Sequence, residues 1–192
     1  IAMFQLDNLL GGRTTVTIDQ SHRLRELVTD WKLLSDLSFA DLILWVPIRK
    51  DIKLWPTGHI AVAHIRPTTS STVFINDVIG QEVLWGARPN IDEALSSGDI
   101  MRNTEPERVG ELLIKEETIP VFFQGQVIAV ISRHRNAEHM RSPGKLELNY
   151  REIANNLYQM VAEGNFPYQS AASLFEPVPR VGDGLIRLDV NG

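Results

Sequence analysis

The chain has 192 residues, a hydrophobic content of 43%, a charged content of 22% and a formal net charge of -5. This length suits one domain with extensions, and the acidic balance argues against direct binding to nucleic acid. The absence of cysteine excludes disulfides, cysteine-ligated zinc and cysteine nucleophiles. No apolar run reaches the roughly 18 residues of a membrane span. The first residues lack the layout of a signal peptide, so we expect a cytoplasmic protein without a membrane partner.

Residues 1–20 are predicted to be an N-terminal extension with a short amphipathic helix that ends at Gly11. A longer helix is expected over residues 19–35, with Asp19 or Ser21 as its N-cap. Its apolar residues recur three and four positions apart and therefore share one face. This face fits both a core stripe and a dimer seam. Its members include Leu24, Trp31 and Leu34.

Three strands and a long irregular stretch follow this helix. Residues 39–48 and 58–66 predict an antiparallel pair, and residues 72–75 predict a third, short strand. The irregular stretch covers residues 76–108, and a stretch of that length inside a compact domain is usually functional or mobile. Its short helix-like pieces lie near residues 81–85 and 91–96.

A hairpin and a long helix come next. Residues 110–123 and 126–132 predict two strands joined by a tight turn at residues 124–125. The fold class is thus α/β (α+β), with a central antiparallel sheet flanked by N- and C-terminal helices. The last predicted helix spans residues 145–163, and its apolar face includes Ile153 and Leu157.

The composition changes after Gly164. Residues 165–182 are rich in proline and serine and predict a linker. Residues 183–192 predict one strand and the beginning of an Asn-Gly turn, and such a turn indicates that a partner strand follows. We therefore expect a chain that is cut just inside a second domain.

Four segments contain distinctive sequence motifs: residues 30–42 (DWKLLSDLSFADL), 127–134 (VIAVISRH), 160–167 (MVAEGNFP) and 182–189 (GDGLIRLD). In this order they resemble the sensor region of actinobacterial sensor histidine kinases of the PdtaS type. The resemblance covers residues 21–192. It implies a GAF-like sensor domain at residues 21–164, a linker, and the start of a PAS domain at residues 183–192.

The resemblance also implies what lies outside this chain. It implies a phospho-acceptor domain and a kinase domain that uses ATP and Mg, so that this fragment needs no cofactor. It implies a homodimer and a response-regulator partner of the RNA-binding antiterminator type. Asn155, Asn156 and Leu157 match part of a phospho-acceptor motif, but no histidine precedes them. We therefore predict no catalytic residue in this chain.

GAF domains bind small molecules between the sheet and the insertion after the third strand. Aromatic walls with guanidinium groups suit a planar anionic ligand such as a nucleotide. The alternative is that side chains fill this space, so that the domain acts as a dimerisation and relay module without a ligand. The candidate ligand residues are Trp45, His64 and Phe74 on the sheet, with Trp85, Arg88 and Arg102 in its cover.

The histidines give no metal-binding pattern. His59 and His64 lie on one predicted strand at an odd separation, so they should point to opposite faces of the sheet. His134 and His139 are predicted to lie in a polar loop over residues 133–141. That loop fits a solvated connector or a contact with an anion or a partner.

Overall fold

The computed structural model describes residues 2–103, 105–137, 143–167 and 181–183. Its helices and strands follow one another along the chain in the order α1 (Ala2–Leu10), α2 (Ile18–Ser38), β1 (Asp41–Ile48), β2 (Gly58–Ile65), β3 (Glu82–Leu84), α3 (Pro89–Ser97), β4 (Met101–Arg102), β5 (Glu107–Val109), β6 (Leu112–Phe123), β7 (Gln126–Asn136) and α4 (Lys145–Ala162).

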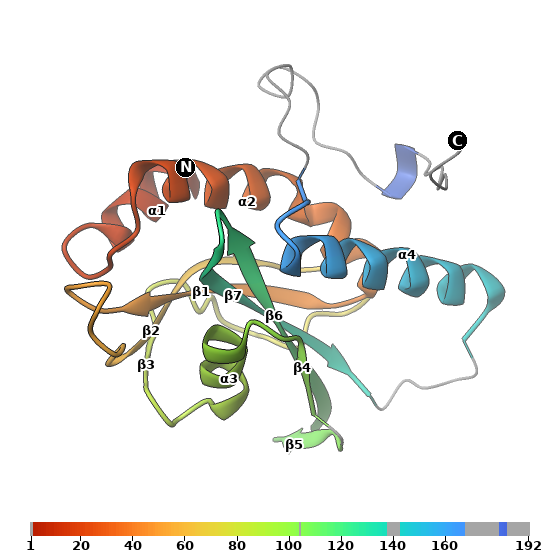
Figure 1. Cartoon of the computed structure of the whole chain (residues 1–192). Helices are drawn as coiled ribbons and strands as arrows, with labels where there is room; N and C mark the ends of the chain where they lie inside the picture. Colours follow the sequence, from red (N-terminus) through yellow and green to blue (C-terminus); the bar gives the residue numbers. More distant parts are fainter. Residues whose placement is uncertain (1, 104, 138–142, 168–180, 184–192) are drawn as a thin grey trace.

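The strands of the described residues form one antiparallel sheet. Its order is β3-β2-β1-β7-β6-β4, and β5 pairs with β6. Helices α2 and α4 cover one face of the sheet, and α3 lies on the other (Figure 1). Strand β1 is buried on both faces because it lies in the middle of this arrangement. The predicted fold class, a helix-flanked antiparallel sheet, is confirmed.

The N-cap of helix α2 is Thr17, which lies two residues before Asp19 and four before Ser21, the two predicted caps. The Thr17 hydroxyl accepts a hydrogen bond from the Gln20 amide, and the Gln20 side chain accepts one from the Thr17 amide. This reciprocal capping box satisfies two free amides at the helix start. The predicted caps, Asp19 and Ser21, therefore lie inside the helix. At the other end the helix continues to Ser38, three residues beyond the predicted end.

The apolar faces of α2 and α4 meet the sheet in the main core. Leu24, Trp31 and Leu34 on α2 are at most 1% exposed. Ile153 and Leu157 on α4 are partly buried and pack against the same cluster. These two helices thus bury their predicted faces within the described chain, on the side of the sheet that carries the larger cluster.

The predicted third strand, residues 72–75, is not a strand. The Thr72 hydroxyl and the Val73 amide donate to the buried carboxylate of Asp41, so the Val73 amide bonds to a side chain and not to a neighbouring strand. The third strand is β3, in a piece predicted as helix-like. It pairs with β2 between Gly80 and Gly86, whose positive φ angles of 86° and 90° permit the flanking turns. The second helix-like piece is confirmed as α3.

The predicted faces of His59 and His64 are wrong because β2 contains a β-bulge. The register passes from Leu44 opposite Ala63 to Trp45 opposite Ala61, which leaves Val62 as an extra residue. One extra residue inverts the alternation of side chains along the strand. Both histidines therefore face the α3 side of the sheet.

The hairpin of β6 and β7 turns at the predicted residues. Gln124 and Gly125 have positive φ angles of 47° and 83°, as a two-residue hairpin turn requires. Strand β7, however, continues to Asn136, because its backbone stays paired with β6 up to Ile114. Arg133 and His134 consequently lie in the sheet and not in the predicted polar loop.

The predicted linker and PAS strand lie largely outside the described residues. A short 3-10 helix at Val181–Asp183 is described, and Val181 packs against the main core cluster. Across the ranges that the structure describes, no helix combines the length and the apolar character that crossing a membrane requires.

Replacing Trp31 with glutamate tests the assignment of α2 to the core. Trp31 is 1% exposed, so Trp31→Glu loses its packing and buries a charge, and we expect unfolding to become easier by at least about 4 kcal/mol. Urea denaturation followed by circular dichroism measures this change. Ile18→Glu, at a position that is 78% exposed on the same helix, is the matched control. Equal stability of the two variants would contradict the assignment.

Candidate functional site

Five polar side chains lie together on the α3 side of the sheet. Strand alternation points them there from four adjacent strands, since Asp41 pairs with His134, His134 with Glu116, and Ile43 with both His64 and Ser132. We call this group the polar row. Its members are Asp41, His64, Glu116, Ser132 and His134.

Two buried carboxylates hold the cover of the polar row in place. Asp36, near the end of α2, accepts hydrogen bonds from the Thr68 amide at 2.7 Å and from the Thr68 hydroxyl at 2.9 Å. Asp41 accepts from the Val73 amide at 2.9 Å and from the Thr72 hydroxyl. A buried carboxylate needs such donors, because burial without them is costly. The segment after β2 is therefore fixed over the N-terminal end of β1.

A chain of hydrogen bonds connects the centre of the site. The Trp45 indole Nε1 lies 2.8 Å from Ser132 Oγ, which lies 2.8 Å from His134 Nε2. An indole N–H only donates, so Ser132 Oγ is the acceptor of the bond from Trp45. The other ring nitrogen of His134, Nδ1, lies 3.7 Å from Glu116 Oε2.

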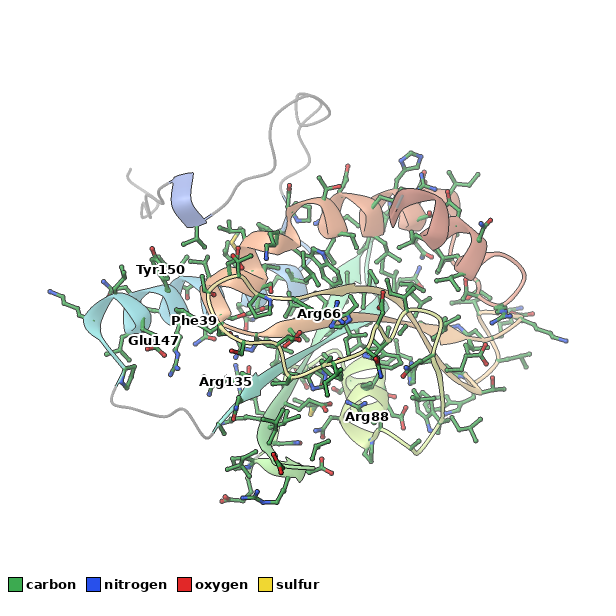
Figure 2. All side chains as sticks on the ribbon, turned by 180° about the vertical axis from the view of Figure 1, so that it is seen from behind. Phe39, Arg66, Arg88, Arg135, Glu147 and Tyr150 are labelled. Atoms are coloured by element: carbon green, nitrogen blue, oxygen red, sulfur yellow. The ribbon has the colours of Figure 1, made fainter. Side chains whose placement is uncertain are left out.

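Electrostatics keep His134 neutral. Burial, together with a smaller contribution from the nearby Arg88 guanidinium, lowers the pKa of His134 to about 3. Burial also raises the pKa of Glu116, whereas Arg88 lowers it by donating a hydrogen bond at 2.5 Å. The guanidinium carbon of Arg88 lies 5.9 Å from the centre of the Trp45 ring, within reach of a cation–π interaction. Figure 2 shows Arg88 beside α3 on this side of the sheet.

His64 is the least satisfied member of the polar row. Its side chain is 1% exposed, and within the described residues neither ring nitrogen has a hydrogen-bond partner. The nearest carboxylate oxygens belong to Asp41, at 3.6 Å from Nε2, and Asp77, at 3.5 Å from Nδ1. The Phe74 ring makes edge contacts with both His64 and His134, at 5.4 and 4.9 Å between ring centres. Phe74 thus fills the space between the two imidazoles.

The structure brings together four of the six candidate ligand residues. Trp45, His64, Phe74 and Arg88 all lie at the polar row or its cover. Arg102 lies on β4, 57% exposed along its side chain, with its guanidinium 3.7 Å from a Glu117 carboxylate oxygen. It takes no part in this cluster.

Trp85 belongs to a second cluster at the β3 edge. Its ring stacks on His59 at 5.4 Å and meets Trp55 edge-on at 4.9 Å. His59 Nε2 lies 2.7 Å from Asp92, which also accepts from the Gly86 amide at 2.8 Å. Burial lowers the pKa of His59, which favours a neutral ring that donates to Asp92. This cluster fastens α3 to the edge of the sheet.

Four members of the polar row were not predicted as site residues: Asp41, Glu116, Ser132 and His134. Ser132 and His134 carry a usable signal, because they occupy alternate positions at the end of an apolar run and so share a strand face. Glu116 and Asp41 join them only through strand pairing. Among the described residues, no group of histidine and acidic side chains is arranged to hold a metal ion.

The other face of β7 carries a matching polar contact with α4. Arg133 forms an ion pair with Glu117, lies 3.3 Å from Asn155 Oδ1, and has its guanidinium 4.7 Å from the centre of the Tyr158 ring. The Tyr158 hydroxyl lies 2.9 Å from Ser38 Oγ, at the end of α2. Burial raises the pKa of Tyr158 to about 12. This cluster joins α2, α4 and the sheet.

Two of the larger hollows formed by the described residues lie away from the polar row. One of about 370 Å³ lies between Phe39, the hydroxyl-bearing residues 69–71 and the start of α4. Figure 2 shows Phe39, Glu147 and Tyr150 close together there, and the Phe39 and Tyr150 rings stack at 6.3 Å. The other, of about 480 Å³, lies near Trp55. Neither is lined by Trp45, His64 or Phe74.

The buried neutral His134 predicts a pH dependence of stability. An unfolded histidine takes up a proton below pH of about 6.5, whereas folded His134 does so only near 3. The unfolded state therefore binds more protons in this window, and stability falls as the pH falls through it, by up to about 1.4 kcal/mol per pH unit for each such histidine. We expect His134→Gln to make this slope shallower between pH 6.5 and 5.

Urea denaturation at several pH values measures the slope. The matched control is His22→Gln, because His22 is exposed on α2. Identical slopes for wild type and His134→Gln would show that His134 is not the neutral buried group described here.

Comparisons with known proteins identify the relatives of this fold. A family model described as "Histidine kinase PdtaS, GAF domain" matches residues 6–154. The sensor histidine kinase PdtaS of Mycolicibacterium smegmatis is 36% identical over 193 residues, which cover 99% of this chain and 38% of the relative. PdtaS of Mycobacterium tuberculosis is 35% identical over 197 residues, with the same coverage.

A solved structure agrees with these sequence matches. The sensor region of a sensor histidine kinase is 34% identical, with a TM-score of 0.79 over 98% of this chain and 63% of that one. This chain spans about two fifths of the length of the curated relatives. The chain belongs to the PdtaS family of sensor histidine kinases, and residues 6–154 match the GAF domain of that family.

Proposed function

We propose that this chain is the sensory part of a cytoplasmic two-component sensor histidine kinase. It passes a signal, set by a ligand or by the dimer state, to PAS and kinase domains that follow it. The observation that carries this proposal is the alignment with PdtaS over 99% of this chain but only 38% of the relative. The remaining length of such a relative has room for the catalytic parts, where ATP and Mg are used.

The same family membership supports the proposed partners. The full-length protein acts as a homodimer and transfers phosphate to a response regulator of the RNA-binding antiterminator type. None of these partners needs a catalytic residue in this chain. Its role is to set the geometry in which the following domains work.

The exit from α4 is built to transmit a change in geometry. Arg23, whose side chain is 2% exposed on α2, donates to the carbonyl oxygens of Gly164 at 3.1 Å and Pro167 at 2.6 Å. A Cβ atom at Gly164 would lie 2.9 Å from the Phe122 carbonyl oxygen. The chain leaving α4 is thus held against both helix α2 and strand β6, so a shift of α2 or of β6 reaches the following segment.

A relay module without its own ligand is the second candidate. It is favoured by the burial of Trp45, His64 and Phe74 against one another beneath the cover. A ligand at this position has to displace at least one of these side chains. The signal in this case is the arrangement of two copies of the chain.

Arg23→Gln tests the relay in the full-length protein. Losing the bonds to Gly164 and Pro167 frees the exit of α4, so we expect autophosphorylation from radiolabelled ATP to fall about five-fold or more. Arg25→Gln is the matched control, because Arg25 pairs with Asp7 on α1 and not with the exit. Equal activity of wild type and Arg23→Gln, with Arg25→Gln also unchanged, argues against transmission through this joint.

A thermal-shift screen of the chain with nucleotides, haem and metal ions separates the two candidates. A ligand present at a hundred times its Kd stabilises the fold by about 2.7 kcal/mol. At about 2–4 °C per kcal/mol, the Tm rises by roughly 5–10 °C. We expect this shift for a ligand that binds beneath the cover, and we expect Trp45→Phe, which removes the indole donor to Ser132, to reduce it. A uniform lack of shift supports the relay module.

A further inference from the structure

A hollow with cationic and aromatic walls lies at the β3 edge of the sheet, away from the polar row. It is formed by three separate segments: the loop after α1, the loop between β1 and β2, and β3. Its volume is about 480 Å³. We call it the Trp55 corner, defined by Arg13, Arg49, Lys50, Leu54, Trp55 and Glu82.

The apolar side chains of the Trp55 corner are open to solvent. Trp55 is 66% exposed and Leu54 is 57% exposed, and both line the hollow. The Trp55 ring meets Trp85, whose neighbour Leu84 on the edge strand is 76% exposed. Single exposed apolar residues need no explanation, but several that adjoin a hollow mark a binding surface.

The charge of this corner opposes that of the chain. Its lining holds three cations, Arg13, Arg49 and Lys50, against one carboxylate, Glu82, which already pairs with Arg13 at 2.5 Å. The local excess is thus two positive charges in a chain whose net charge is -5. Such an excess attracts an acidic partner and repels a basic one.

The corner is a fixed structure and not a loose loop end. The Arg49 amide donates to the Arg13 carbonyl oxygen at 3.1 Å, and Arg49 Nε donates to Thr15 Oγ1 at 3.2 Å. These bonds hold the loop after α1 against the loop after β1. The Arg49 guanidinium therefore keeps its position at the hollow without a ligand, which lowers the ordering cost of binding.

We propose that the Trp55 corner docks an acidic peptide segment of a partner protein that carries one aromatic or large aliphatic side chain. The apolar side chain enters the hollow against Leu54 and Trp55, and flanking carboxylates pair with Lys50 and Arg49. A concave hollow suits an inserted side chain, whereas a flat lipid surface gains most from apolar groups that protrude. The exposed Leu84 extends the apolar surface beyond the hollow, as an extended segment requires.

Selection from a library of short random peptides, displayed against the immobilised chain, tests this proposal. We expect enriched peptides to be acidic with an aromatic or large aliphatic residue, and to bind at least about ten-fold more weakly to Trp55→Ser and to Lys50→Glu. Raising the salt concentration should weaken binding to the wild type. Leu146→Ser, on an exposed residue of α4, is the matched control and should bind like the wild type.

Three results would overturn the proposal. The first is a selection without acidic bias, or one whose peptides bind the Trp55→Ser and Lys50→Glu variants as well as the wild type. The second is Trp55-dependent binding to vesicles of anionic phospholipid in place of peptides, which indicates a membrane surface. The third is Trp55-dependent self-association in analytical ultracentrifugation, which indicates a second copy of the chain. Thermal denaturation of each variant confirms that the exposed substitutions leave the fold intact.

Discussion

The need to satisfy two buried carboxylates organises the α3 side of this molecule. Asp36 and Asp41 end one helix and begin the central strand, and both are almost fully removed from solvent. Residues 68–73 supply the hydrogen-bond donors to Asp41 and, together with Lys32, those to Asp36, so the segment after β2 is held over the N-terminal end of β1. Without those donors each carboxylate would be buried at a cost of several kcal/mol. The cover, and with it the position of Phe74 over the polar row, follows from this constraint.

Strand β7 connects this cover to the two long helices. Its residues alternate, so Ser132 and His134 bond beneath the cover while Arg133, between them, contacts Glu117 and α4. A rearrangement under the cover that moves β7 also moves the Arg133 contact with α4. Buried polar networks favour arrangements in which most groups keep a partner, because an unpaired buried polar group is costly. This supports the proposal that the state of the sheet reaches the helix exit.

The features predicted correctly from the sequence are those with a local signal. Apolar spacing gave α2 and α4, and the tight turn gave the β6–β7 hairpin. The errors arose where distant residues decide: Asp41 draws residues 72–75 away from a strand, and the extra residue Val62 turns His64 to the face of His59. The candidate site was predicted only in part for the same reason. Residue type suggested Trp45 and Arg88, but strand pairing decided that Ser132 and His134 join them.

The two candidate binding regions differ in what binding costs, and this difference bears on their roles. Beneath the cover, Trp45, His64 and Phe74 already occupy the space, so a ligand there must favour an arrangement other than the present one. Binding of that kind shifts a conformational equilibrium by the difference in affinity for its two states. At the Trp55 corner the apolar walls are already open to solvent, and Arg49 is already held in place by Thr15. Binding at the corner therefore needs no rearrangement of the sheet, whereas binding beneath the cover does.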